Sequence, residues 1–406
     1  MPMIRLLAPA GLVAILAAHG PAFAQATKPD VFTERLAVAQ ARLALDMVQR
    51  LSTPNKHMVA VSPASLAGAA AALDLGASNQ MRDALHTILG FRRSADSGAD
   101  LAALRTSVER LAATEQGASP LKFANSIVFD DSVTLYPGVA LAFKQARLDH
   151  AVLDFSSPTT ADAVNKRIHE QTNGLIPEII DRAPGGASLL VLNALHFKDR
   201  WNTPFDRANT KPAAFKRVSG VPVMVSTMHL PQGRYLFRRS PRFVGIELPY
   251  ANPRFSMVIV TTRAERAAPA RTFRPVGEWL TGKGFALAEG DLALPHFDVS
   301  SREDLTRALD TLGLRSARLS PNALAGFSAD PARITRVMQR VELRLNEEGT
   351  ETAAATAVAV ERGVDPAYVR MVVDRPFVFA LRDAASGLML VAGYVAQPGT
   401  LATAAR

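Results

Sequence analysis

Between positions 346 and 364 the side chains alternate with a period of two. One face would carry six residues, five of them β-branched, and the other would carry alanines bounded by Glu351 and Glu361. A helix or a linker would also suit so many alanines. At helical spacing, however, the β-branched residues would surround the axis, and Gly349 would cost about 1 kcal/mol in a helix interior. The pattern therefore favours a β-strand.

Elsewhere the hydrophobic pattern switches between helical and strand periods. It predicts helices over residues 32–51, 66–75, 79–89, 101–111, 141–146, 160–171, 276–280 and 303–312. It predicts strands over residues 59–61, 122–129, 151–155, 188–197, 221–228, 233–237, 243–248, 255–261, 291–299, 334–345, 377–381 and 388–395. Ser62 and Pro63 suit a helix cap and a first helical position, and Gly90 suits a helix end. Helices that come first and strands that mostly come later predict an α+β architecture.

The first 24 residues have the features of a secretory signal. Arg5 precedes an apolar run over residues 6–18, and Ala22-Phe23-Ala24 suits a cleavage site. The run is too short for a membrane-spanning helix, and no later segment reaches about 18 apolar residues. We therefore expect an exported protein, periplasmic or extracellular and without a membrane partner, with an uncleaved anchor as the alternative. No linker or repeat divides residues 25–406, which predicts a single domain.

Composition excludes several kinds of chemistry. The chain has no cysteine, so disulfides, thiolate nucleophiles and cysteine-based metal sites are absent. The histidines lack ligand spacing, and we expect neither a metal nor a cofactor. The formal net charge is +9, but the arginines are scattered and aromatic residues are sparse among them. A solvated basic surface is therefore favoured over a groove for nucleic acid.

Enzyme motifs are weak. Ser119-Pro120-Leu121-Lys122 fits the S-x-x-K pattern of penicillin-interacting hydrolases, which need the serine at the start of a helix. Pro120 and the predicted strand after it argue against that reading, and no S-D-N or K-T-G motif follows. His169-Glu170 lacks the second histidine of a zinc-protease helix. We therefore predict that the protein is not an enzyme and has no catalytic residues.

Five segments in order resemble the serpin family over essentially all of the mature chain. They are V-S-P-A-S-L at 61–66, N-A-L-H-F-K-D-R-W-N-T-P-F at 193–205, L-A-L-P-H-F-D-V at 292–299, N-E-E-G-T-E-T-A-A-A-T at 346–356 and D-R-P-F-V-F-A-L-R-D at 374–383. The resemblance implies three β-sheets, about eight or nine helices and an exposed reactive-centre loop at about 347–366. It also implies a serine protease inhibitor that acts as a suicide substrate. The protease forms an acyl-enzyme with the loop, and the loop then inserts into the central sheet.

By the same resemblance, the hinge of the loop comprises Glu347, Gly349, Thr350, Thr352, Ala353, Ala354 and Ala355. Thr352 stands where the family usually has alanine. Family spacing places the specificity residue at Gly363, but the loop returns to Pro376 about two residues later than usual. Arg362 would suit a trypsin-like pocket with an acidic base. The reactive bond is therefore left open among Arg362, Gly363 and Val364.

Residues that match positions controlling sheet opening in the family are Ser62, Ser65, Asn193, Trp201 and Gln339. Gln339 stands where a histidine is common, and since glutamine cannot take a positive charge near pH 6, weaker pH sensitivity is expected. The expected partner is a serine protease of trypsin-like specificity, with a papain-like cysteine protease as a further candidate, and the chain is expected to be a monomer. The alternative is a serpin scaffold that binds or carries a ligand without inhibiting.

Overall fold

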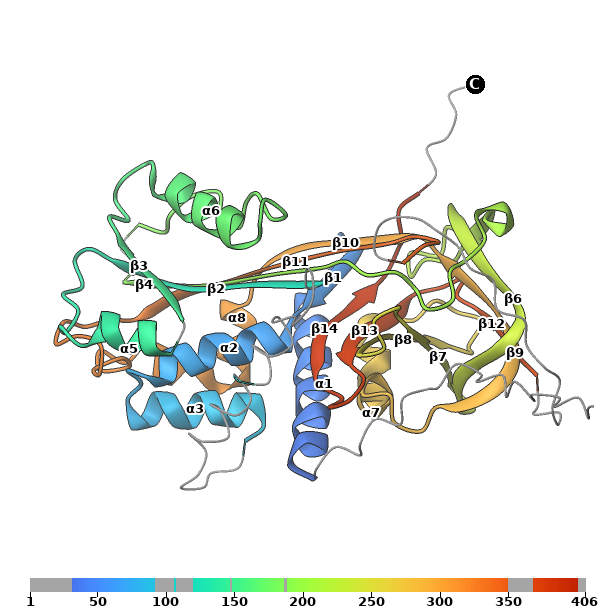
Figure 1. Ribbon diagram of the computed structural model, residues 1–406, viewed down its shortest axis with the longest axis horizontal. Coiled ribbons are helices and arrows are strands. Elements are labelled where there is room, and N and C mark those ends of the chain that lie inside the picture. Colours follow the sequence, from blue (N-terminus) through green and yellow to red (C-terminus); the bar gives the residue numbers. More distant parts are fainter. Residues whose placement is uncertain are drawn as a thin grey trace, which may run out of the picture.

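Two β-sheets with helices packed against them make up the part of the chain that the computed structural model describes, residues 31–91, 106, 120–146, 148–185, 188–349 and 368–400 (Figure 1). The helical elements are α1 (Val31–Leu51), α2 (Pro63–Asp74), α3 (Asn79–Leu89), α5 (Val139–Gln145), α6 (Thr160–Gln171), η1 (Arg207–Asn209), η2 (Ala270–Val276), α7 (Gly277–Leu280), α8 (Thr306–Leu309), η3 (Asp310–Leu314) and α9 (Arg315–Arg318). The strands are β1 (Met58–Val61), β2 (Leu121–Asp130), β3 (Asp149–Leu153), β4 (Leu189–Phe197), β5 (Lys211–Phe215), β6 (Val223–Arg239), β7 (Phe243–Pro249), β8 (Phe255–Thr262), β9 (Ala286–Pro295), β10 (Phe297–Asp304), β11 (Ile334–Leu345), β12 (Val369–Val372), β13 (Phe377–Asp383) and β14 (Met389–Val395).

The smaller sheet has five strands in the order β10-β11-β4-β2-β3. β4 is antiparallel to β2, and β11 is antiparallel to β10, but β4 and β11 run parallel to each other. Eight of the nine residues of β4 are buried, as expected for a strand covered on both faces. Helix α2 covers one face of the sheet and α6 lies over the other (Figure 1).

The larger sheet follows the order β1-β14-β13-β8-β7-β6-β9-β12, with β5 paired to β6. The ladder between β6 and β9 changes register between Leu230 and Gly233. Before this irregularity β6 pairs with β5 and β9, and after it β6 pairs with β7 and β9. The irregularity between Leu230 and Gly233 therefore divides the larger sheet into two regions. Together with the smaller sheet, they correspond to the three sheets that the serpin resemblance implies.

Helix ends follow the sequence signals. Ser62 caps α2, because its hydroxyl accepts a hydrogen bond of 3.1 Å from the Ser65 amide, and Pro63 is the first helical residue. Helix α3 ends at Gly90, whose φ of 80° is left-handed. A Cβ at Gly90 would lie 2.3 Å from that of Ala39, so α1 packs directly against this turn. None of the described helices is long and apolar enough to cross a membrane.

Several boundaries differ from the sequence predictions. The strand predicted over 291–299 is two strands in different sheets, because β9 ends at Pro295 and β10 begins at Phe297. The predicted helix 303–312 starts too early, since β10 runs to Asp304, whose carboxylate then accepts a hydrogen bond from the Thr306 amide. The strands predicted over 221–228 and 233–237 form the single strand β6, and β12 was not predicted. The signal sequence lies outside the described residues, as does nearly all of the helix predicted at 101–111.

Candidate hinge and sheet-opening site

The parallel pair of β4 and β11 is the feature that the candidate site is built around. Its ladder runs from Ile334 opposite Leu189 to Leu343 opposite Phe197. Parallel ladders are slightly less stable per residue than antiparallel ones. A segment that follows β11 and folds back onto the sheet must run antiparallel to β11, and therefore to β4 as well. Inserted between them, it would replace one parallel ladder with two antiparallel ladders.

Residues 346–349 form a tight turn directly after β11. The Asn346 amide donates to the Gly349 carbonyl at 2.9 Å, and the Asn346 side-chain oxygen accepts from the amides of Glu348 and Gly349 at 3.1 and 3.2 Å. Gly349 has a φ of 137°, and a Cβ there would lie 2.4 Å from the Arg200 Cα. Only glycine suits both the conformation and the close approach. The turn therefore fixes the start of the predicted hinge beside the segment that follows β4.

Trp201 holds this turn in place. Its indole Nε1 donates to the Asn346 carbonyl at 3.0 Å, and its amide donates to the Glu348 carbonyl at 2.9 Å. The ring is 2% exposed and stacks on Tyr250 with 4.5 Å between centroids. The Phe205 amide adds a hydrogen bond of 2.7 Å to the Glu347 carbonyl. The chain beyond β4 thus satisfies three consecutive carbonyls of the turn.

The Glu347 side chain is buried, with 6% of the residue exposed. One carboxylate oxygen accepts a hydrogen bond of 2.6 Å from the Thr210 hydroxyl, and the other lies 2.9 Å from His296 Nε2. Burial raises the pKa of Glu347. The Thr210 hydroxyl, the Glu347 amide and His296 together lower the pKa by a larger amount, so the pKa lies below its usual value. His296 is the residue between β9 and β10. The carboxylate therefore joins the start of the predicted hinge to the point where the chain passes from one sheet to the other.

Three of the predicted sheet-opening residues form one buried hydrogen-bonded group. Gln339 of β11 accepts from the Ser62 amide at 2.7 Å and donates to the Ser62 carbonyl at 3.1 Å. The Ser62 hydroxyl donates to the Ser65 hydroxyl at 2.9 Å. All three residues are at most 1% exposed. Gln339 therefore ties β11 to the start of α2 below the sheet.

Asn193 lies opposite Gln339 across the β4–β11 boundary. Its side-chain nitrogen donates to the Asn125 side chain on β2 at 3.1 Å and to the Leu192 carbonyl at 3.0 Å. Its side-chain oxygen is buried, and the described residues offer it no hydrogen-bond partner. The side-chain network therefore divides between β4 and β11: Asn193 is fixed to β2, and Gln339 is fixed to α2.

The structure brings Trp201, Glu347 and Gly349 together, and separately Ser62, Ser65, Asn193 and Gln339. The remaining predicted hinge and reactive-bond residues lie outside the described residues: Thr350, Thr352, Ala353, Ala354, Ala355, Arg362, Gly363 and Val364. Sequence reasoning did not single out Asn125, Thr210 or His296. Asn125 gave a usable signal, because it is a polar residue inside an apolar strand pattern. Thr210 and His296 gave no such signal, because residues of these types are common at protein surfaces.

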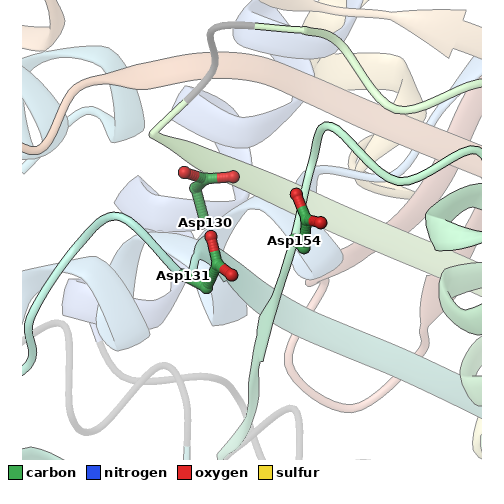
Figure 2. Close-up of side chains that lie close together, drawn as sticks. All are labelled: Asp130, Asp131 and Asp154. Carbon is green, nitrogen blue, oxygen red and sulfur yellow. The ribbon is translucent and has the colours of Figure 1, made fainter.

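Three carboxylates at the ends of β2 and β3 also lie close together (Figure 2). Atoms of Asp130, Asp131 and Asp154 come within 4.8 Å of one another, an arrangement that could hold a cation. Asp130 also accepts a hydrogen bond of 2.9 Å from the Phe155 amide, and Asp154 accepts one of 2.8 Å from the Ser156 amide. These bonds are those of carboxylates that order their own loop. We assign no ion to the group.

Comparisons with known proteins agree with the fold. Residues 38–398 match the family described as Serpin (serine protease inhibitor). Serine protease inhibitor 42Dd of Drosophila melanogaster is 32% identical over 344 residues, which cover 82% of this chain and 90% of that protein. Tengpin, a thermophilic serpin in its native state, has a TM-score of 0.78 at 22% identity, covering 90% of this chain and 94% of that one. Human thyroxine-binding globulin has a TM-score of 0.75 at 20% identity, with 90% and 99% covered.

Proposed function

The chain belongs to the serpin family, and on that premise we propose that it inhibits serine proteases as a suicide substrate. The target protease cleaves the reactive segment and becomes bound to it as an acyl-enzyme. The segment before the cut then inserts between β4 and β11 and carries the protease with it. The protein itself performs no catalytic turnover in this scheme.

The observation that carries the proposal is the directly paired, parallel β4 and β11 next to the hinge turn. The 16 residues from Glu347 to Arg362 would span roughly 50 Å as a strand, about the size of a protease domain. About a dozen new ladder hydrogen bonds at about 1 kcal/mol each would favour insertion by about 10 kcal/mol, before burial of the Thr/Val face is counted. That amount is comparable to the whole stability of many domains.

In this proposal, the contacts of Gln339 and Asn193 allow β4 and β11 to move apart at low cost. Because the side-chain network divides between them, β4 and β11 separate without breaking the bonds to Asn125 or Ser62. Only the parallel ladder has to break there. The Asn193 side-chain oxygen, which lacks a partner, would face the inserted strand, where a threonine hydroxyl could donate to it.

The cut is proposed at Arg362-Gly363, with Gly363-Val364 as the competing bond, and the target as a trypsin-like protease. A cysteine protease remains a further candidate. We also propose that the protein is exported and acts as a monomer in the periplasm or outside the cell. Mass spectrometry of the released C-terminal fragment identifies the bond. A fragment that begins at Gly363 supports Arg362 as the specificity residue, and one that begins at Val364 supports Gly363.

A carrier without inhibitory activity is the second candidate, since the fold is shared with thyroxine-binding globulin. Small, uncharged side chains from Thr352 to Ala359 favour inhibition over this alternative, because a narrow opening between two strands admits them readily. Limited proteolysis followed by thermal unfolding separates the two. Insertion worth about 10 kcal/mol should raise the melting temperature of the nicked protein by about 12 °C, because the entropy of unfolding is about 2.1 cal/mol/K per residue. An unchanged melting temperature would favour the carrier.

The inhibitory step itself is tested with trypsin, chymotrypsin and elastase on a denaturing gel. We expect a complex that survives SDS with the unchanged protein and with Thr350→Ser, the matched control. Thr350→Arg should give only cleaved inhibitor, because insertion would bury an unpaired charge. A stable complex with the arginine variant would contradict the insertion mechanism.

A further inference from the structure

A cavity of about 260 Å³ opens on one face of β5, β6, β9 and β12. Cross-strand register places His229 of β6 opposite Ala293 of β9, and Ala293 opposite Val372 of β12. Asp291 and Arg370 form the neighbouring pair of the β9–β12 ladder. Small and apolar side chains thus surround a few polar groups, which is the usual composition of a small-molecule site.

Asp291 is an acidic group of the cavity whose charge is only weakly compensated by its neighbours. Its Oδ1 atom is buried and has no hydrogen-bond partner among the described residues. Its other oxygen lies 3.7 Å from Arg370 Nε, beyond hydrogen-bond distance, and the Arg370 side chain is 77% exposed. A buried acceptor without a donor is costly. The Asp291 side chain as a whole is 33% exposed, so a ligand in the cavity would meet the other oxygen, Oδ2, and a cation there would stabilise the charge of this partly buried carboxylate.

His229 adds a second acceptor. Its Nδ1 lies 2.9 Å from the Asn209 carbonyl oxygen, which can only accept, so Nδ1 carries the proton. In the neutral ring, Nε2 is then an acceptor. The cavity therefore offers a carboxylate oxygen and an imidazole nitrogen, and both call for hydrogen-bond donors.

Two tyrosines near Asp291 have pKa values that respond to its charge. Burial raises the pKa of Tyr235 to about 12, and Tyr368 and Asp291 add to the rise. The pKa of the Tyr368 hydroxyl is also raised, by burial first and then by Asp291, with Arg370 opposing and Glu289 adding. Burial disfavours a charge of either sign, but the contribution of Asp291 to both shifts shows that its carboxylate makes the local potential more negative, which favours a cation over an anion.

We propose that this cavity binds a small organic cation, a protonated primary amine with a short apolar body. The ammonium group donates to Asp291 Oδ2 and His229 Nε2, and the apolar body packs against Val225, Ala293 and Val372. Such binding is separate from protease inhibition, although β12 is the first described strand after the reactive segment.

Isothermal titration calorimetry of the full chain with benzylamine at pH 7 tests the proposal, with benzyl alcohol and benzoate as neutral and anionic probes of similar size. We expect benzylamine to bind at least tenfold more tightly than either. Asp291→Asn should weaken benzylamine at least tenfold and leave benzyl alcohol unchanged. Arg370→Gln should strengthen benzylamine, because it removes a nearby positive charge. Asp162→Asn, which changes an exposed carboxylate of α6, is the control and should change nothing.

A second variant covers the case in which Asp291→Asn misfolds. Ala293→Leu fills the floor of the cavity, keeps the carboxylate and should abolish benzylamine binding. Circular dichroism establishes that each variant is folded. The proposal is wrong if benzylamine fails to bind at 10 mM, if benzoate binds as well as benzylamine, or if folded Ala293→Leu binds benzylamine as the unchanged protein does.

Discussion

The link between Gln339 and Ser62 gives the sharpest test of how the smaller sheet is anchored. Gln339→Ala removes both hydrogen bonds to the Ser62 backbone, at 2.7 and 3.1 Å, in a region that water does not reach. Each buried group left without a partner costs about 1–3 kcal/mol. The Ser62 carbonyl keeps its hydrogen bond of 3.1 Å from the Leu66 amide, so only the Ser62 amide is left without a partner. This predicts a loss of about 1–3 kcal/mol in the free energy of unfolding of the intact protein.

Gln339→Met separates hydrogen bonding from packing, because methionine has a similar volume but no strong donor or acceptor. The methionine variant should therefore lose nearly as much unfolding free energy as the alanine variant. Arg336→Ala, on the same strand, is the matched control. It breaks only a half-exposed ion pair with Asp304, which is worth about 1 kcal/mol or less.

Urea unfolding, followed by tryptophan fluorescence and far-UV circular dichroism, measures these differences. The two tryptophans, Trp201 and Trp279, are both buried and should report the transition. A Gln339→Met variant within about 1 kcal/mol of the unchanged protein would show that the Ser62 link contributes little. The anchoring of β11 on α2 would then have to come from apolar packing alone.

Three further predictions concern single residues. Gly349→Ala should lower the stability of the intact form by about 1–3 kcal/mol or more in urea unfolding, because of its φ of 137° and the 2.4 Å approach to Arg200. The pKa of Glu347 is lowered in the folded state, so its stabilising charge is fully present above about pH 4.3 and is lost as the pH falls through the lower folded pKa. The stability difference between the unchanged protein and Glu347→Gln should therefore be largest near pH 6 and shrink below about pH 4, and a difference that grows on acidification would contradict the shift. Arg382→Met should cost about 3–5 kcal/mol in the same assay, since it leaves the Glu247 carboxylate, 2.6 Å away, buried without its partner.

Elements with a strong period were predictable from the sequence. The ranges 160–171 and 334–345 agree with α6 and β11, because an amphipathic helix and a strand with one buried face each impose their period on the side chains. β12 was missed because it has only four residues, two of them exposed. The change of sheet at His296 was missed although the large apolar residues change phase there, from Leu292 and Leu294 to Phe297 and Val299. Ala293 and Pro295, which are also apolar, hide this change of phase in the sequence.

The candidate site was predictable as a set of residues but not as an arrangement. Family motifs indicated Trp201, Glu347 and Gln339, whereas their contacts join residues far apart in the chain. Nothing local to His296 says that its ring lies 2.9 Å from a carboxylate 51 residues later. The division of the network between Asn193 and Gln339 depends on the parallel register of β4 and β11, which only the folded sheet defines.

The two ends of the undescribed segment explain why insertion should wait for a protease. Residues 346–349 are held beside Trp201 at the end of β11, and the chain is described again at Tyr368, next to β12 of the other sheet. While the segment is intact, full insertion between β4 and β11 would have to pull β12 away from β9, a ladder from Val369 to Val372. A cut near Arg362 leaves β12 in place and frees only the part that follows β11. In the proposed mechanism, cleavage therefore removes the need to break the β12–β9 ladder and leaves the hinge untouched, so that antiparallel pairing on both sides of the inserted strand could form.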